Sequence, residues 1–360
     1  MYYERDNCLV NISNSILKHF GIDTLHASHD KLDSILAKSR DKKICLCLFD
    51  GMGKYIEELH AEYIPHILEH NRFTITSVFP PTTVAATTSL LSALFPCETG
   101  WLGWTQRVAT CPHPVIMFSS KDDVTQADVK PHTYETYKYV SIIDRLQQKN
   151  ITAEEIKSFE LKEKSMKGFF NVVNGKLHSN DFLYVYNTEP DTSLHQYGTK
   201  SKKISKIVHQ IDTYMEKIAK ENPHTLFIVL ADHGHIDTKY FLLDEHDDLL
   251  DCLSDKMNFL EPRAAVFFVK PDRRKSFVEI FNKYYGEYFR LYSRADVERL
   301  KIFGEGKPNV DFESFIGDFL AVSHSEYAIV NSPDKMSMIS HHAGGTDQEK
   351  YINVSFFNDD

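Results

Sequence analysis

The sequence has no long apolar segment. No apolar run approaches the roughly 18 residues that a membrane-spanning helix needs, and the opening MYYERDNCLVNISNS has neither the basic start nor the apolar stretch of a secretory signal. We therefore expect a cytoplasmic protein without a membrane partner. The six cysteines form no Cys-x-x-Cys pair. Cys45 and Cys47 lie within an apolar run, so we expect reduced, buried and structural thiols.

Positive charge is also scarce. The formal net charge is −10, which argues against a nucleic-acid polymer as the main partner, because phosphate backbones are bound by clustered lysine and arginine. Hydrophobic residues at 42% and charged residues at 26% are ordinary for a soluble globular protein. Any phosphate group that this chain binds must be neutralised locally.

The chain has 360 residues, more than one hydrophobic core usually holds, which predicts one large domain and a smaller one. Short apolar runs recur between helical patterns, and one helix is amphipathic over 204–218. Such alternation predicts an α/β fold with a mostly parallel central sheet and helices on both faces. A further helix is expected over 84–95, after Pro80 and Pro81. The expected strands are 44–49, 73–78, 182–186 and 226–230.

The order of expected strands and helices changes after the acidic stretch DEHDDLLD. A strand is expected over 264–269, a helix from Pro271 to Tyr284, a second strand at YFRLYS and a short helix near 295–300. This pattern predicts a small inserted α+β cap domain at 259–332. The catalytic core would then comprise residues 1–258 and 333–360.

Two polar phrases near the N-terminal end follow predicted strands, where open α/β sheets bind ligands. Asp50 follows the strand at 44–49 directly, with Gly51 and Gly53 behind it, so it is either a helix N-cap or a metal ligand. Thr82 and Thr83 begin the helix of SVFPPTTVAATTSL, whose dipole favours nearby negative charge. Each threonine either caps the helix or supplies a reactive hydroxyl.

Two further phrases combine carboxylates with imidazoles. Asp191 and His195 have i, i+4 spacing and form either an exposed ion pair or part of a zinc site. Asp232 and His233 are adjacent at the end of a buried strand, where desolvation is costly unless they share a ligand, so a metal is favoured. We leave His235 out of the metal site, because an extra histidine nearby is more often a neighbour of the ligands or solvent-facing.

The phrases FDGMG, FPPTTVAATTS, LFPCETGWLGW, EPDTSLHQYG, ADHGHID and HHAGG occur in that order between residues 45 and 345. This order resembles the alkaline phosphatase superfamily, in its type I phosphodiesterase/nucleotide pyrophosphatase branch. The resemblance implies a hydrolase of phosphodiester or phosphoanhydride bonds with two Zn²⁺ ions, or Mn²⁺ in their place, and a phosphothreonine intermediate on Thr83. It implies one metal held by Asp191, His195 and His342 and another held by Asp50, Asp232 and His233.

The histidine of the last phrase is assigned to His342 rather than His341, because the family's histidine directly precedes a small-residue turn. One departure bears on the substrate: this branch commonly has an asparagine three residues after the nucleophile, where this chain has Ala86. A phosphomonoesterase or phosphonoacetate-type hydrolase on the same two metals is therefore the alternative. Thr87 or Thr88 would replace the missing donor, and Thr87 is our candidate substrate contact. No Cys-x-Pro-x-Arg phrase is present, so sulfate ester cleavage is not expected.

The GWLGW run contributes two aromatic side chains near the expected nucleophile. Trp101 and Trp104 either pack in the core or form a wall on which a base or another planar group stacks. We therefore include Trp104 as a candidate contact to a small-molecule phosphate ester or nucleotide. The sequence leaves the oligomeric state open.

Overall fold

The computed structural model describes residues 4–359, and its centre is a six-stranded sheet. β8, β1, β7 and β6 are parallel neighbours, whereas β17 runs antiparallel between β8 and β2. The sheet is therefore mixed, because β17 alone runs opposite to the other five strands. In order across the sheet, the strands are β2 (Asn71–Thr76), β17 (Tyr351–Phe357), β8 (Thr225–Leu230), β1 (Lys43–Phe49), β7 (Phe182–Asn187) and β6 (Ala153–Lys157).

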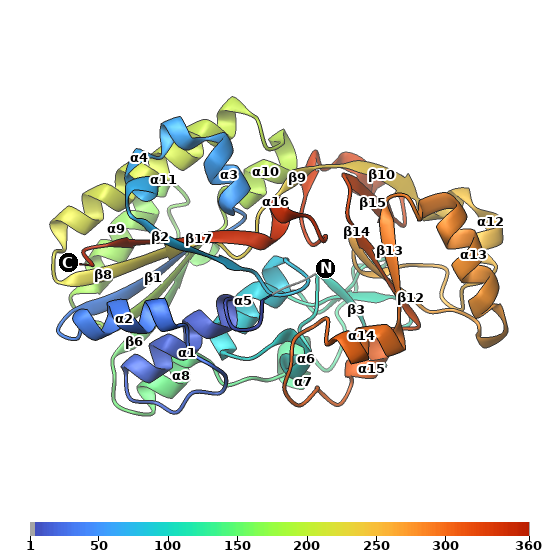
Figure 1. The fold of residues 1–360 in the computed structure, drawn as a ribbon, viewed down its shortest axis with the longest axis horizontal. Helices are drawn as coiled ribbons and strands as arrows, with labels where there is room; N and C mark the ends of the chain where they lie inside the picture. The colour runs from blue at the N-terminus through green and yellow to red at the C-terminus, as the bar shows by residue number, and fades with distance from the viewer. Residues whose placement is uncertain (1–3, 360) are drawn as a thin grey trace.

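Helices cover both faces of this sheet, as Figure 1 shows with α11 above the strands and α1 and α2 below them. The upper layer comprises α3 (Lys54–Leu59), α4 (Pro65–Glu69), α9 (Met166–Leu177), α10 (Asp191–Tyr197) and α11 (Lys202–Glu221). The lower layer comprises α1 (Leu9–His19), α2 (Asp30–Lys38), α5 (Thr83–Ser92) and α8 (Ile142–Gln147). The strands β1, β7 and β8 are buried almost throughout, which explains why they read as continuous apolar runs.

The predicted elements of the core lie close to the observed ones. The amphipathic helix extends to 202–221, and its buried face includes Ile204, Ile211 and Met215. The helix expected over 84–95 begins at Thr83 and ends at Ser92, because Ala93 adopts a left-handed conformation with φ 61°. Cys45 and Cys47 are buried, and all six cysteines are free thiols, as expected.

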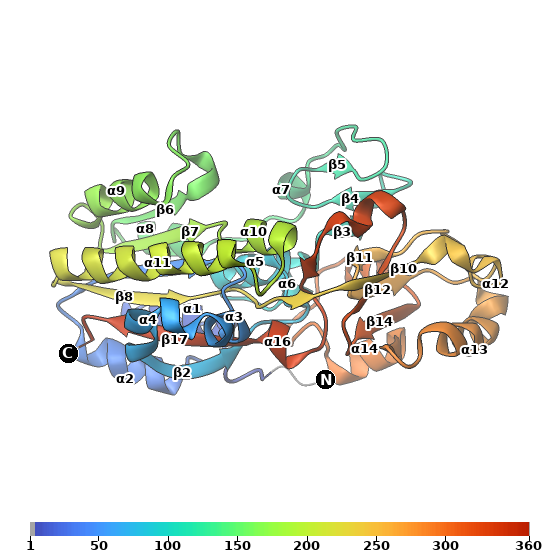
Figure 2. The ribbon, with the colours of Figure 1, turned by 90° about the horizontal axis from the view of Figure 1, so that it is seen from above.

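A second, seven-stranded sheet lies beside the first and is antiparallel. Figure 2 shows it at the opposite end of the molecule from α9 and the chain's C-terminus. Part of it comes from the segment expected as an insert, but β3, β4 and β5 come from residues 105–122. Its strands are β13 (Phe289–Ser293), β14 (Phe319–Ser323), β12 (Ala264–Phe267), β11 (Phe259–Glu261), β3 (Thr105–Arg107), β4 (Pro114–Ile116) and β5 (Lys121–Asp122).

The remaining elements are short or pack on the second sheet. α13 packs there through Phe277 and Phe281, which belong to a separate aromatic-rich core. Two further sheets have two strands each, β10 with β15 and β9 with β16. These elements are α6 (Pro96–Thr99), α7 (Thr133–Thr136), β9 (Ile236–Asp237), β10 (Lys239–Leu242), α12 (Asp247–Leu250), α13 (Arg274–Tyr285), α14 (Arg294–Leu300), α15 (Phe312–Phe315), β15 (Tyr327–Val330), β16 (Ser340–His341) and α16 (Asp347–Lys350). Within residues 4–359, no helix is both long and apolar enough to cross a membrane.

A buried ion pair connects the second sheet to the loop after His342. Arg263 donates from Nε and Nη2 to the two carboxylate oxygens of Glu349, at 2.7 and 2.8 Å, and neither side chain is exposed. Glu349 also accepts from the backbone N–H of Gly344 at 2.7 Å. The pair therefore holds the turn that follows His342 against the second sheet.

We expect Arg263→Ala to lower the free energy of unfolding by about 3–5 kcal/mol, because it leaves the Glu349 carboxylate buried without its partner. Urea denaturation of the purified variant measures this loss. Arg274→Ala is the matched control: its guanidinium pairs with Asp318 at 2.6 Å, but its side chain is 53% exposed, so the loss should stay below about 1 kcal/mol. Equal losses in the two variants would contradict the proposed role of the Arg263 pair.

Candidate metal centre and active site

The expected site residues gather where the parallel strands β1, β7 and β8 end. Asp50 follows β1 and Asp232 lies just beyond β8, while Asp191 begins α10 shortly after β7. The backbone N–H of Asp191 donates to the carbonyl of Asp50 at 2.9 Å, so the segments that follow β1 and β7 are in direct contact. The carboxyl ends of parallel strands thus bring residues together that are far apart in the sequence.

Glycines allow the loops after β1 and β8 to touch. Gly51 has φ +73° and donates its N–H to Asp232 Oδ1 at 3.0 Å. A Cβ on Gly53 would lie 2.6 Å from the Cα of Gly234, closer than any side chain allows. The glycines of FDGMG and ADHGHID therefore permit the approach of Asp50 to Asp232 and His233.

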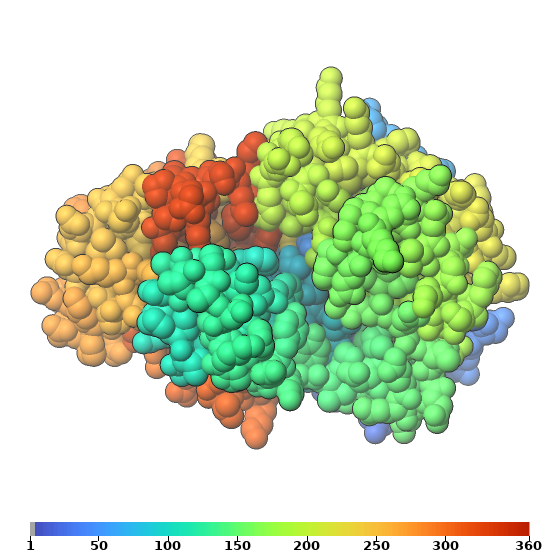
Figure 3. Space-filling view, turned by 180° about the vertical axis from the view of Figure 1, so that it is seen from behind, coloured from blue at the N-terminus to red at the C-terminus, as the bar shows by residue number. Residues whose placement is uncertain are grey.

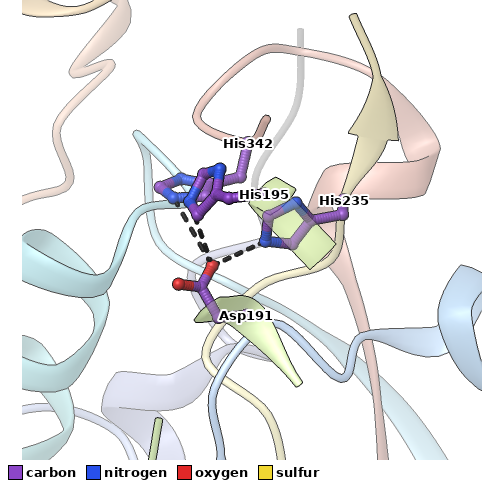
Figure 4. Close-up of side chains that lie close together, drawn as sticks. All are labelled: Asp191, His195, His235 and His342. Carbon is purple, nitrogen blue, oxygen red and sulfur yellow. Dashed lines mark hydrogen bonds and ion pairs between the residues drawn. The ribbon is translucent and has the colours of Figure 1, made fainter. Parts of the chain in front are cut away.

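The first group of possible metal ligands is centred on Asp191. Its Oδ1 atom lies 3.4 Å from Nε2 of His195, 2.6 Å from Nε2 of His235 and 3.8 Å from Nε2 of His342. Figure 4 shows the three imidazoles arranged around this one carboxylate oxygen. The structure thus brings together the three residues expected at one metal, and it favours His342 over His341.

His235 was not expected in this group. Its side chain is fully buried, and it is one of the four residues whose ligand atoms lie within 4.8 Å of one another. His233 and His235 are two positions apart, with ring centroids 5.6 Å from each other. The His-x-His spacing beside an expected ligand was the available signal, and our sequence interpretation set it aside.

The second group comprises Asp50, His233 and again Asp191. Nε2 of His233 lies 3.3 Å from Oδ1 of Asp50 and 3.5 Å from Oδ2 of Asp232. Asp232 lies outside the set whose atoms are mutually within 4.8 Å, yet it is fully buried and its Oδ1 accepts from Gly51 and His233 N–H groups. The carboxylates of Asp50 and Asp232 therefore both face the imidazole of His233.

The pKa values of this cluster show that its carboxylates have too little positive charge nearby to balance them. Burial raises the pKa of Asp50, and the nearby charge of Asp191 raises it further. Burial also raises the pKa of Asp232 well above its usual value, with Asp50 adding to the effect. Burial opposes protonation of His233, but Asp232 and then Asp50 raise its pKa to about 10. Carboxylates crowded in this way are stabilised by a cation.

The residues fit a pair of divalent cations. Asp232 Oδ2 and His342 Nδ1 are buried atoms without a hydrogen-bond partner among residues 4–359, and an unsatisfied buried carboxylate oxygen is costly unless it binds an ion. Nδ1 of His195 lies 2.8 Å from the carbonyl of Ser340, to which it donates, so its Nε2 is free to bind a metal. Carboxylate oxygen and imidazole nitrogen are donors suited to Zn²⁺ or Mn²⁺.

Thr83 lies beside the second group. Its Oγ1 atom is 3.2 Å from Nε2 of His233 and 3.4 Å from each carboxylate oxygen of Asp50. The Tyr186 hydroxyl donates to Asp50 Oδ2 and so fixes the orientation of that carboxylate. Thr83 is the first residue of α5, where free backbone N–H groups favour negative charge.

The neighbouring threonines have other partners. Thr82 is the N-cap residue of α5, but its hydroxyl donates to the buried Glu261 at 2.6 Å instead of capping the helix. Thr87 donates to the carbonyl of Thr83 at 2.6 Å, so its proton is directed along the helix and not toward a ligand. Glu261 also accepts from Trp104 N–H at 2.7 Å, and burial raises its pKa to about 7. Glu261 is the last residue of β11 (Phe259–Glu261), and none of the sequence motifs considered above includes it.

A cavity of about 400 Å³ opens onto the site, and its lining includes Thr83, Asp191, His195 and His342. Figure 3 shows the surface hollowed between the red segment before His341 and the teal segment of β4 and β5. Trp104 lines the cavity and is 45% exposed, whereas Trp101 is fully buried and donates to the Tyr137 carbonyl at 2.8 Å. The two expected aromatic side chains therefore divide between cavity and core.

Comparison with known proteins extends this picture. The family model described as type I phosphodiesterase/nucleotide pyrophosphatase matches residues 115–347. The matched part contains Asp191, His195, Asp232, His233 and His342, while Asp50 and Thr83 lie before it. No curated protein matches the chain in sequence.

Solved structures resemble the whole fold at low sequence identity. Murine ectonucleotide pyrophosphatase/phosphodiesterase 5 is 15% identical, with a TM-score of 0.61 over 87% of this chain and 88% of that one. Phosphonoacetate hydrolase from Sinorhizobium meliloti 1021 is also 15% identical, with a TM-score of 0.66 over 88% of this chain and 90% of that one. These likenesses establish a shared α/β fold.

Proposed function

We propose that this chain, which belongs to the type I phosphodiesterase/nucleotide pyrophosphatase family of the alkaline phosphatase superfamily, hydrolyses phosphodiester or phosphoanhydride bonds through a covalent intermediate on Thr83. One observation carries the proposal: the Thr83 hydroxyl lies within 3.4 Å of both Asp50 and His233 at the start of a helix. A hydroxyl in this position has acceptors for its proton and a partial positive field beside it.

The proposed cofactors are two divalent cations, Zn²⁺ or Mn²⁺. Asp191, His195 and His342 would hold one, and Asp50, Asp232 and His233 the other. When bound, such ions neutralise a phosphoryl group and lower the pKa of hydroxyl oxygens next to them. The donor set and the orphaned Asp232 oxygen support this assignment.

In the proposed reaction, Thr83 Oγ1 forms a bond to phosphorus and the bond from phosphorus to the leaving oxygen breaks. The leaving alcohol or phosphate takes up a proton, and water then cleaves the phosphothreonine and restores the hydroxyl. Tyr186 holds the Asp50 carboxylate toward Thr83, and the N-terminus of α5 stabilises charge on the phosphoryl oxygens.

The cavity favours a substrate with little negative charge beyond the reacting phosphate. Among its described lining residues, Lys335 is the single lysine or arginine, and its ammonium is paired with Asp123. The apolar lining includes Trp104, Phe259 and Leu260. Of the two bond types, this lining favours a diester whose leaving group is planar and uncharged, such as one that carries a nucleobase. Murine ectonucleotide pyrophosphatase/phosphodiesterase 5, in an inactive variant, forms a complex with AMP.

We further propose that residues 259–332 act as a cap that selects the group next to the phosphate. The support is that β11 supplies Phe259, Leu260 and Glu261 to the lining of the cavity that Thr83 and Asp191 also line. A cap that contributes side chains to the cavity but no ligand to the ions can change specificity without changing the chemistry.

Ala86 keeps one alternative open: a phosphomonoesterase or phosphonoacetate-type hydrolase on the same residues. Ala86 is fully buried and offers no donor one turn after Thr83. Steady-state assays of a diester, a dinucleotide, a monoester and phosphonoacetate rank the two functions. The highest kcat/KM for the diester or dinucleotide supports our proposal, whereas turnover of monoester or phosphonoacetate alone would refute it.

Trp104→Ala should raise KM about tenfold for a substrate that carries a nucleobase, because stacking on an aromatic ring contributes ~1–3 kcal/mol per base. A diester with a small aliphatic leaving group should show little change. Paired Michaelis–Menten measurements on the two substrates test this difference. An equal loss for both would show that Trp104 supports the site's structure and does not select the base.

A further inference from the structure

The buried histidine beside the expected metal ligands has an unusual hydrogen-bond environment. His235 has no exposed surface, and its Nε2 atom lies 2.6 Å from Oδ1 of Asp191. Its other ring nitrogen, Nδ1, lies 3.1 Å from the hydroxyl of Ser340. The position of the ring proton therefore decides what Nε2 does.

The Ser340 hydroxyl determines where that proton lies. Ser340 is fully buried and its hydroxyl donates to the carbonyl of Leu194 at 2.7 Å. Because a hydroxyl has one proton, its oxygen must act as the acceptor toward His235. The imidazole therefore carries its proton on Nδ1, and Nε2 has a bare lone pair.

The contact between Nε2 and Asp191 then brings two acceptor atoms together. A lone pair and a carboxylate oxygen 2.6 Å apart repel each other unless a cation binds both. The neighbouring His195 shows the same arrangement, since its Nδ1 donates to the Ser340 carbonyl at 2.8 Å and its Nε2 faces the same Asp191 oxygen. One residue, Ser340, thus directs two bare imidazole nitrogens toward one point.

The backbone holds this arrangement in register. β9 and β16 pair with Ser340 opposite Asp237 and His341 opposite Ile236. This ribbon places His235 and His342 on adjoining chain segments, with ring centroids 5.1 Å apart. His235 is therefore fixed beside the other three donors by main-chain pairing and not by its side-chain contacts alone.

We propose that His235 binds the cation of the Asp191 group directly, so that this site has four protein donors: Asp191, His195, His235 and His342. The inference rests on the two-cation site proposed above, but not on the reaction. Four protein ligands complete a tetrahedral zinc site, whereas a catalytic zinc usually keeps an open position. The site therefore suits a cation that accepts a fifth ligand from the substrate or water, such as Mn²⁺ or five-coordinate Zn²⁺.

The decisive test is a crystal structure of the whole protein loaded with Zn²⁺, with anomalous data at the zinc edge. We expect a distance of about 2.1 Å from the ion to Nε2 of His235. A zinc ion bound by Asp191, His195 and His342, with His235 Nε2 more than about 3 Å away and hydrogen-bonded to Asp191, would overturn the proposal.

A solution test uses Co²⁺, whose visible absorption reports coordination number, in His235→Ala and a matched His341→Ala control. His341 is similarly buried and its ring centroid lies 5.1 Å from that of His195, but it is outside the ligand group. His235→Ala should change the absorption band of one of two bound Co²⁺ ions and weaken that ion's binding by more than about 100-fold, the upper end for losing a group that only hydrogen-bonds to a ligand. His341→Ala should leave the band unchanged.

An unchanged band in His235→Ala, or the same change in both variants, would refute direct binding. These readouts are independent of turnover. A protein that binds two ions through His235 but cleaves no diester would leave this inference standing and refute the proposed function.

Discussion

Thr83→Ala should lower kcat by roughly 1,000-fold or more, because the proposed nucleophilic oxygen is gone. The two proposed metal ions should stay bound, since Asp50 and His233 keep their positions and Thr83 Oγ1 lies 3.2 Å or more from each. Steady-state kinetics together with metal analysis measures both effects. Acid quenching during turnover of a substrate labelled at phosphorus should trap labelled protein for the unmodified chain and none for the variant.

Thr82→Val is the matched control for this prediction. Thr82 is adjacent, and its hydroxyl donates to Glu261, whereas the Thr83 hydroxyl contacts Asp50 and His233. Valine keeps the side chain's shape, so kcat should fall far less than in Thr83→Ala. Thr83→Ser, which restores a hydroxyl, should recover part of the activity. Substantial activity in Thr83→Ala, or a larger loss in Thr82→Val, would exclude Thr83 as the nucleophile.

Strand ends were the part of the site that the sequence predicted best. A buried parallel strand reads as a continuous apolar run, and the polar residue that follows it lies at the ligand-binding edge of the sheet. Asp50, Asp191 and Asp232 were found in this way, and the structure brings them to the same edge. Their roles as ligands stay a proposal, as does the cytoplasmic location.

The mixed character of the central sheet could not be read from the same pattern. β17 follows α16, which lies at the edge of the sheet that carries the site, so the chain must cross back antiparallel between β8 and β2. Its sequence, YINVSFF, is an apolar strand pattern without any mark of direction. Strand order and direction depend on where the preceding segment ends in space.

The seven-stranded sheet could not be predicted from the sequence for a similar reason. β3, β4 and β5 are two or three residues long, too short for a periodic signal, and only β3 pairs with a strand far along the chain, Thr105 lying opposite Leu260 of β11. Glu261 reaches Thr82 and Trp104 only through this pairing. Its buried carboxylate beside the nucleophile helix is a consequence of tertiary structure that no local phrase predicts.

Removing the metal ions with a chelator should abolish turnover and lower the melting temperature. The ions would bind the folded protein and not the unfolded chain, so each ion would contribute about 4 kcal/mol to the free energy of unfolding at a concentration 1,000 times its dissociation constant. Without them, burial and then the charge of neighbouring carboxylates disfavour the ionised forms of Asp50 and Asp232, whose pKa values are raised for these two reasons. Differential scanning calorimetry before chelation, after it, and after addition of Zn²⁺ or Mn²⁺ measures the loss and its recovery.

Thr83→Ala serves as the internal control for this experiment, because it separates the contribution of the ions to stability from their contribution to the reaction. The variant keeps all seven proposed ligands, so chelation should lower its melting temperature by the same amount although it has no turnover to lose. Asp50→Asn removes one carboxylate from the cluster; it should weaken binding of one ion and reduce the chelator's effect on melting. A chelated protein that still turns over diesters and melts unchanged would contradict the two-cation site, because the buried carboxylates would then have to be stabilised by the protein alone.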